Sequence, residues 1–206
     1  MQLDLTSFLI GFAILIVSLS IHEAAHAWTA DRLGDSTARQ LGRVSLNPVV
    51  HIDPIGTLLL PVLSMFSPLP LLGWAKPVPV NMSRLRHPRR DFMIIAAAGP
   101  ISNFLQALVI AAVFHAFYDP YASDLMPRVL RYAVQTNLLL AFFNLIPIPP
   151  LDGGNVLAGL VPESAARMLD QVRQFGFIAL YALMLSGMLT DVIVPPTRFL
   201  MRLLQL

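Results

Sequence analysis

Residues 8–30 read FLIGFAILIVSLSIHEAAHAWTA, and this stretch decides the fold because it is apolar throughout yet ends in two histidines and a glutamate. As a helix, it is long enough to cross the roughly 30 Å hydrocarbon core of a bilayer. His22 and His26 are four residues apart, so both side chains lie on one face of that helix. Glu23 is turned about 100° from His22. The stretch predicts a spanning helix with ionisable side chains in its last third.

The composition of the whole chain predicts a membrane protein. Hydrophobic residues make up 56% and charged residues 13% of the 206 residues, against roughly 45–50% and about 25% in soluble domains. The chain has no cysteine, which excludes disulfides, thiolate ligands and a cysteine nucleophile and leaves imidazole and carboxylate as metal ligands. The net charge is only +2, with the basic residues in loops, so no nucleic-acid partner is expected. No signal-peptide pattern precedes the first apolar run, which is expected to be retained.

Three further apolar stretches are expected to cross the bilayer. They are residues 92–117, 132–146 and 175–194. The second of these is followed directly by the turn PIPPLDGG (147–154). The tail, residues 198–206, alternates Arg with Leu and Met and is expected to lie along the interface.

A fifth apolar stretch, residues 55–72, contains three prolines, so a regular spanning helix is not expected there. Basic residues lie on both sides of it, and the positive-inside rule places both groups in the cytoplasm. The stretch is therefore predicted to enter the membrane and return. The basic residues are Arg32, Arg39 and Arg43 before it, and Lys76, Arg84, Arg86, Arg89 and Arg90 after it.

This topology has a consequence for Asp152. If the first helix runs inward and residues 55–72 re-enter, the second span returns outward and the third comes back inward. Asp152 then reaches the same membrane face as His22 and His26. A full crossing by residues 55–72 would place it on the opposite face.

The flanks of the fifth stretch, GRVSLNP (42–48) and GWAKPVPVN (73–81), look like strands. Pro77 and Pro79 remove donors from one strand edge and leave Val78 and Val80 free to pair on the other. We therefore predict a small β-sheet at the membrane boundary. The expected fold is one α-helical polytopic membrane domain over residues 1–206, with about four spanning helices, one re-entrant segment and this sheet.

The histidine pair predicts a metal site. Both rings can reach one zinc ion, and Glu23 can lie beside the open coordination position as the base for a water molecule. Ionisable groups near hydrocarbon depth cost roughly 2.5–3.5 kcal/mol each on insertion scales, so three within five residues need a compensating partner. A metal supplies one. The alternative interpretation is a solvated helix end.

A catalytic zinc needs a third protein ligand, for which His51, His87, His115 and a few aspartates are available. His87 lies in a basic loop, and His115 falls near the outer end of the second span. Asp152 follows the third span within PPLDGG (149–154), a turn that can direct a side chain back into the membrane. Asp152 is the preferred ligand, with a helix-capping aspartate as the alternative and His51 as the next candidate. His51 and Asp53 are equally well explained by turn chemistry.

Three motifs in order resemble the site-2 protease family of intramembrane metalloproteases: HEAAH (22–26), AGPISN (98–103) and NLIPIPPLDGG (144–154). The resemblance covers roughly residues 20–157 and is closest to compact bacterial members without PDZ or CBS domains. It implies close helix packing at Gly99 and Asn103.

The resemblance also implies roles for the polar residues. His22, His26 and Asp152 would bind one Zn²⁺ per chain, Glu23 would be the catalytic acid and base, and Asn144 would act near the scissile peptide. A satisfied amide capping the helix is the other interpretation of Asn144. The expected function is an intramembrane zinc endopeptidase for regulated intramembrane proteolysis, with a transmembrane protein as substrate and the lipid bilayer as its surroundings. The expected location is the inner (plasma) membrane, multi-pass, with the site towards the cytoplasm.

Other classes fit less well. A non-catalytic metal-binding or helix-binding scaffold would use the histidines and Asp152 but would not need Glu23. A transporter would be expected to show internal repeats, and none is visible. A rhomboid-type serine protease is disfavoured because Met184 replaces the glycine expected two residues before Ser186, and no aspartate pair lies on two spans as an aspartyl protease would require.

Overall fold

The computed structural model describes residues 5–64, 74–118 and 125–206, and within these ranges the chain is helical without any strand. The longer helices are α1 (Leu5–Arg32), α4 (Pro88–Phe117), α5 (Leu125–Asn144), α6 (Asp152–Leu160), α7 (Glu163–Val172), α8 (Gly176–Leu185) and α9 (Met188–Leu203). The shorter elements are α2 (Thr37–Gln40), η1 (Pro48–His51), the π-helical η2 (Pro54–Leu59), α3 (Leu60–Ser64), η3 (Met82–Arg84) and η4 (Arg173–Phe175).

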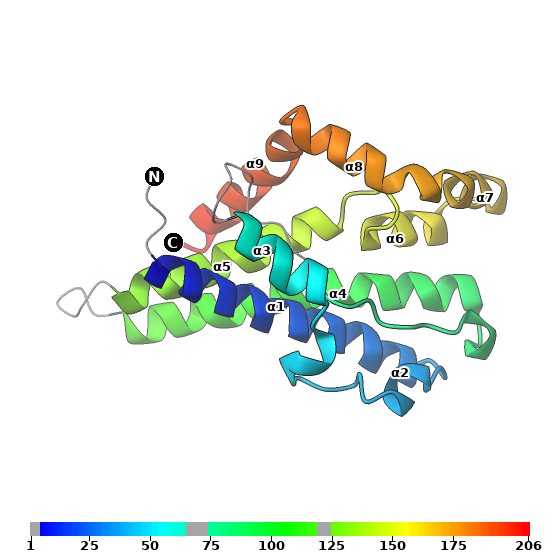
Figure 1. Ribbon diagram of the computed structural model, residues 1–206, viewed down its shortest axis with the longest axis horizontal. Coiled ribbons are helices and arrows are strands. Elements are labelled where there is room, and N and C mark those ends of the chain that lie inside the picture. The colour runs from blue at the N-terminus through cyan, green and yellow to red at the C-terminus, as the bar shows by residue number, and fades with distance from the viewer. Residues whose placement is uncertain (1–4, 65–73, 119–124) are drawn as a thin grey trace.

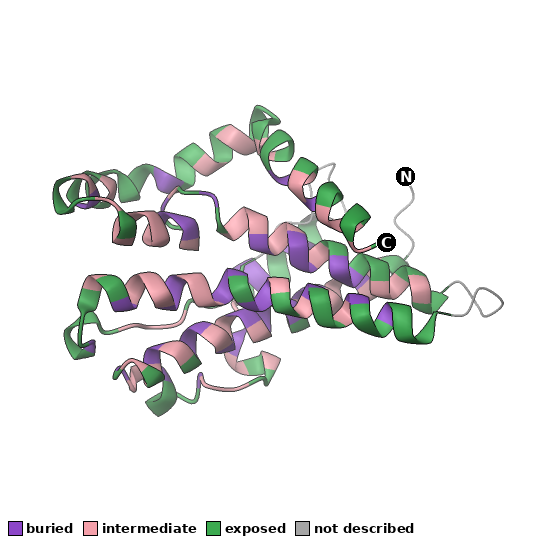
Figure 2. Cartoon of the chain, turned by 180° about the vertical axis from the view of Figure 1, so that it is seen from behind, coloured by how far each residue is buried: buried purple, intermediate pink, exposed green. Residues whose placement is uncertain are grey.

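Helices α1, α4 and α5 lie side by side along the long axis, each antiparallel to the next in the chain (Figure 1). Helix α4 is central and packs against α1, α5 and α6, while α9 packs against α5. Figure 2 shows buried positions where these helices face one another, whereas α7 and α8 are mostly exposed or half-buried.

Small side chains explain how closely α4 approaches its neighbours. Its buried positions recur every three or four residues, which places them on one face. Membrane helices use small residues at their contacts because backbones can then come together. The buried face of α4 includes Ala96, Gly99, Asn103, Ala107 and Ala111.

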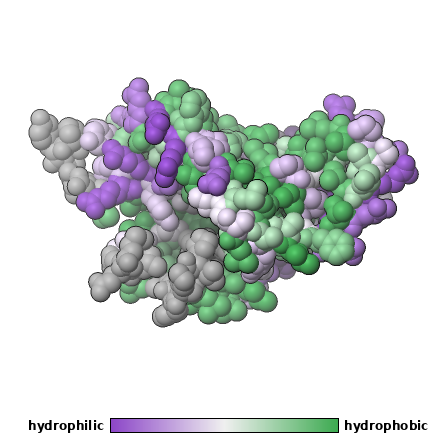
Figure 3. Space-filling view, turned by 90° about the horizontal axis from the view of Figure 1, so that it is seen from above, coloured by the Kyte–Doolittle hydropathy of each residue, from purple (hydrophilic) through white to green (hydrophobic). Residues whose placement is uncertain are grey.

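Among the described residues, two helices, α1 and α4, are long and apolar enough to cross a membrane, and the number rises to three if the bent pair of α7–α8 with α9 is counted as one span. On the face drawn in Figure 3, hydrophilic side chains gather towards the two ends of the long axis, with apolar side chains between them. The first two predicted spans, residues 8–30 and 92–117, fall within α1 and α4.

The prediction of about four spans was wrong. Residues 132–146 fall mostly within α5. That helix also carries Arg128, Arg131 and Gln135, and it is not apolar enough over its length to count as a span. Residues 175–194 are interrupted because α8 ends at Leu185 and Gly187 adopts φ 78°, a left-handed conformation that ends helices. The chain bends by 75° there before continuing as α9.

The re-entrant prediction for residues 55–72 is only partly addressed, because residues 65–73 lie outside the described residues. The first part of the stretch forms η2 and α3.

The predicted β-sheet was also wrong. Residues 74–80 have no regular secondary structure and pair with no described strand, and residues 42–47 form turns and bends before η1. The reason lies in a side chain. The Arg43 guanidinium donates hydrogen bonds to the carbonyl oxygens of Lys76 and Pro77, the latter over 3.2 Å. The Lys76 N–H donates to the His51 carbonyl at 2.8 Å. Backbone groups that a partner strand would use are therefore already occupied.

Candidate metal centre

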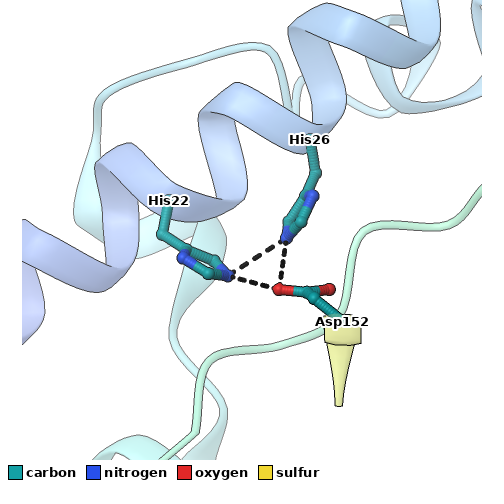
Figure 4. Close-up of side chains that lie close together, drawn as sticks. All are labelled: His22, His26 and Asp152. Atoms are coloured by element: carbon teal, nitrogen blue, oxygen red, sulfur yellow. Dashed lines mark hydrogen bonds and ion pairs between the residues drawn. The ribbon is translucent and has the colours of Figure 1, made fainter. Parts of the chain in front are cut away.

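Three side chains from two helices point toward one another (Figure 4). His22 and His26 project from α1, and Asp152 reaches them from the first turn of α6. The two Nε2 atoms are 3.1 Å apart, and Asp152 Oδ2 lies 3.1 Å from His22 Nε2 and 3.3 Å from His26 Nε2. Both histidines are buried and Asp152 is half-buried.

The other ring nitrogens fix how the two imidazoles are protonated. His26 Nδ1 lies 2.7 Å from the Ile95 carbonyl oxygen, which can only accept, so Nδ1 carries the proton. His22 Nδ1 lies 2.5 Å from Asn103 Oδ1, which is also an acceptor, so Nδ1 carries its proton as well. In neutral imidazoles both Nε2 atoms then present lone pairs to each other and to the Asp152 carboxylate.

This donor set fits zinc. Three acceptor atoms at such distances repel one another unless a cation lies between them. Tetrahedral zinc with bonds of about 2.0–2.2 Å holds its ligand atoms roughly 3.3 Å apart, close to the measured 3.1–3.3 Å. Two imidazoles and one carboxylate leave a fourth position open, as catalytic zinc sites require. Hydrogen bonds from Nδ1 to a carbonyl or amide oxygen are the usual support for such ligands.

Two glycines allow Asp152 to reach the site. A Cβ on Gly153 would collide with the carbonyl of Leu145, and a Cβ on Gly154 would lie 2.5 Å from the Pro149 nitrogen. The turn before α6 therefore folds back directly onto the first turn of that helix. The N-terminal position of Asp152 also suits its charge, because the helix dipole favours an anion there.

Gly99 on α4 forms one wall of the centre. A Cβ at this position would lie 2.5 Å from His22 Nε2 and would also collide with His26 Nε2. Close helix packing at Gly99 was expected from the resemblance, but its proximity to the two ligand nitrogens was not. Any side chain on Gly99 would occupy the space beside the two Nε2 atoms.

Glu23 lies next to His22 in α1 and is half-buried. Its carboxylate is not among the three converging groups. Arg43 and His51 are both buried and both interact electrostatically with Glu23. Burial, together with the nearby Arg43 cation, lowers the pKa of His51. In the sequence, Arg43 is one of several basic residues, and the single signal available is its place within a predicted strand.

The remaining predicted residues lie elsewhere. The Asn144 amide donates a hydrogen bond to the Leu140 carbonyl at 3.0 Å, within the last turn of α5. His51 is not in the converging group and bonds to the Ser45 carbonyl at 2.8 Å. Asp53 accepts hydrogen bonds from two backbone N–H groups at the start of η2.

The two remaining histidines are engaged away from the centre. His115 lies 2.7 Å, through Nε2, from the Leu204 carbonyl. His87 immediately precedes α4, at the start of that helix. Neither belongs to the converging group among the described residues.

Comparison with known proteins identifies similar chains. The sequence model of peptidase family M50 matches residues 116–187. A Bacillus subtilis protein described as "Putative zinc metalloprotease YwhC" is 35% identical over 187 residues, covering 88% of this chain and 82% of that protein. The Rip2 proteins of Mycolicibacterium smegmatis and Mycobacterium tuberculosis carry the same description and are 31% and 32% identical, each covering 87% of this chain and 68% of the relative. No solved structure gives a significant match.

Proposed function

Because the chain belongs to peptidase family M50, the site-2 protease family, and is a zinc metalloprotease of the membrane, we propose that it is an intramembrane endopeptidase. It cleaves transmembrane segments of other membrane proteins. His22, His26 and Asp152 hold the zinc, and Glu23 moves the proton. The observation that carries the proposal is the convergence of three acceptor atoms within 3.1–3.3 Å of one another, between helices of a largely apolar protein.

When bound, zinc supplies Lewis acidity that polarises a peptide carbonyl and makes water more acidic. Glu23 follows a ligand directly on the same helix, so its carboxylate lies beside the centre without entering the ligand group. It takes a proton from the attacking water and returns it to the leaving amine. Gly99 keeps the space in front of the two histidines open.

Asn144 is proposed to align the substrate through its amide oxygen. The amide nitrogen already donates to the Leu140 carbonyl, and this bond fixes the direction in which the oxygen points.

The orientation follows from charge. Arg32, Arg39 and Arg43 lie at or just beyond the histidine end of α1, and the positive-inside rule favours that end in the cytoplasm. The protein is then a multi-pass protein of the inner (plasma) membrane. Its single domain, over residues 1–206, opens its site towards the cytoplasmic side.

The test is the Glu23→Gln variant, assayed in proteoliposomes against a panel of tagged single-span peptides, with products mapped by mass spectrometry. The expected result is one zinc per chain as in wild type, with cleavage reduced at least about 10³-fold, because the proton-transfer group is lost. Glu163→Gln, an exposed acid at the start of α7, is the matched control and should cleave normally.

Two outcomes would contradict the proposal. One is full cleavage by Glu23→Gln. The other is a wild-type protein that cuts its substrates only outside their apolar segments. The chain would then still be a protease, but not an intramembrane one.

A further inference from the structure

A chain of buried hydrogen bonds runs from the backbone of α5 to the metal centre. The Asn137 amide nitrogen donates to the Ala133 carbonyl at 3.0 Å and to Ser18 Oγ at 3.0 Å. The Asn137 amide oxygen accepts from Asn103 Nδ2 at 2.9 Å. Asn103 Oδ1 then accepts from His22 Nδ1 at 2.5 Å.

The two asparagines are withdrawn from solvent. Asn103 is 0% and Asn137 is 1% exposed. A buried amide must satisfy its groups inside the protein, because an unpaired polar group there costs about 1–3 kcal/mol. Neither asparagine can therefore turn its amide over without losing partners that water would not replace.

The donor-to-acceptor direction of this series of hydrogen bonds is set at the end farthest from His22, at Asn137. The Ala133 carbonyl can only accept, so the Asn137 NH₂ group must face it and the Asn137 oxygen must face Asn103. The Asn103 NH₂ group is thereby committed to Asn137, and the Asn103 oxygen is left for His22. If the Asn103 amide were reversed, a donor would face His22 Nδ1 and drive the ring proton to Nε2. His22 could then not ligate a metal through Nε2.

The two histidines differ in this respect. His26 is held by the backbone carbonyl of Ile95, whose polarity cannot reverse. His22 is held by a side-chain amide, whose polarity depends on its next partner. Only His22 therefore needs a second residue to keep its tautomer.

We propose that Asn137 is a positioning residue for the metal centre: acting through Asn103, it holds His22 in the tautomer that leaves Nε2 free to bind zinc. The inference rests on the proposed function insofar as His22 is a zinc ligand. It adds a residue on α5 whose side-chain hydrogen bonds run to Asn103, Ser18 and Ala133 and not to the three converging groups.

The experiment measures zinc affinity of the full-length protein in detergent, by competition with a chromophoric chelator, for wild type, Asn137→Leu and Asn137→Asp. Asn137→Leu keeps a similar volume but removes the oxygen that orients Asn103. Zinc should then bind roughly 10-fold more weakly, at the low end of the losses that follow when the hydrogen-bonded support of a metal ligand is removed. Asn137→Asp should stay within about threefold of wild type, because burial favours the neutral acid, which still donates to Ala133 and accepts from Asn103.

Thr197→Val is the control, since Thr197 is 2% exposed and its hydroxyl donates to the Ile193 carbonyl within its own helix, α9. Its zinc affinity should equal that of wild type. A role for Asn137 in packing alone predicts that Leu is tolerated as well as Asp, and equal affinity of Asn137→Leu and wild type would overturn the proposal.

Action through Asn103 is tested with the single variants Asn103→Ala and Asn137→Ala and the double variant. The Asn103 change should weaken zinc about 10- to 100-fold, and adding the Asn137 change should cause no further loss. Independent, multiplying effects would show that Asn137 does not act through Asn103.

If the Asn137 variants do not fold, the orientation of the Asn103 amide can still be tested in the wild-type protein. Nuclear Overhauser contacts of the Asn103 NH₂ protons should run to Asn137, and contacts to the His22 ring instead would overturn the proposal. A wild-type protein that binds no zinc would be a failure of the proposed function, whereas zinc binding that is insensitive to Asn137 would be a failure of this inference alone.

Discussion

The packed middle of α4, from Ala96 to Ala111, and the surface of α8 are built from different side chains. Along α4, Ala96, Asn103 and Ala107 are at most 3% exposed, and every one of them is small or carries an amide. Along α8, Ile178 and Leu185 are large aliphatic residues that are 68% and 76% exposed. Helix α8 packs mainly against its sequence neighbours η4 and α9.

This difference follows from how small and large side chains stabilise a membrane protein. Lipid solvates large aliphatic side chains as well as a protein interior does, so these residues need not pack on one another. Small residues gain from close backbone approach, and amides gain from partners inside the bundle. The group formed by His22, His26 and Asp152 lies in this region of small residues and amides, where Gly99 brings α4 against the two histidines.

The largest effect on zinc binding is expected from a change that disturbs the close approach of α4 to α1. Gly99→Ala adds a methyl group about 2.5 Å from His22 Nε2, so zinc binding should weaken more than about 100-fold while the helices still form, since Ala is the best helix former. Zinc content after dialysis and circular dichroism measure the two properties. Gly11→Ala, which would meet only the Tyr132 side chain at 3.1 Å, is the matched control. Zinc retained in Gly99→Ala would mean that the helices can separate here.

A smaller effect, on the free energy of unfolding, is expected at the packed interface between α4 and α5, away from the proposed metal site. Leu138 is 2% exposed and belongs to the buried cluster formed with Ala107, Ala111 and Val134. Leu138→Ala should lower the free energy of unfolding by about 2–5 kcal/mol, because it leaves a cavity between α4 and α5. Denaturant titration in mild detergent measures this. Leu105→Ala on the exposed side of α4 (57% exposed) is its control and should cost much less.

The smallest effect is expected on α8. Ile178→Ala removes a side chain that contacts little within the protein, so the free energy of unfolding should change by no more than about 0.5 kcal/mol and zinc should be retained. The same titration applies. A loss comparable to that of Leu138→Ala would show that α8 is part of the packed region, and the contrast between the two helices would then be wrong.

The sequence predicted the elements that carry the chemistry better than it predicted the overall fold. The spacing of His22 and His26 predicted that these two side chains share one face of a helix, because that is a local geometric feature. The expectation that Asp152 joins them came from the predicted topology and from the resemblance, and the three side chains do converge. Membership of the site-2 protease family and the zinc cofactor, both expected from the motifs, are confirmed by the relatives.

The features that the sequence did not reveal depend on long-range contacts. Residues 74–80 look like a strand, but Arg43 occupies their carbonyls from 33 and 34 positions earlier in the chain. The apolar run near Gly187 looks continuous, but a left-handed glycine divides it. Asn137 gave no signal in the sequence, because the partners of its side chain come from three different helices, α5, α1 and α4.

The central claim is that one metal is held between α1 and α6, and zinc per chain in purified wild type and Asp152→Ala tests it most directly. The account predicts about one zinc per chain in the wild type and a loss or marked weakening in the variant, because two imidazoles alone leave the site one ligand short. A folded wild type without zinc, or a variant that keeps its zinc unchanged, would contradict it.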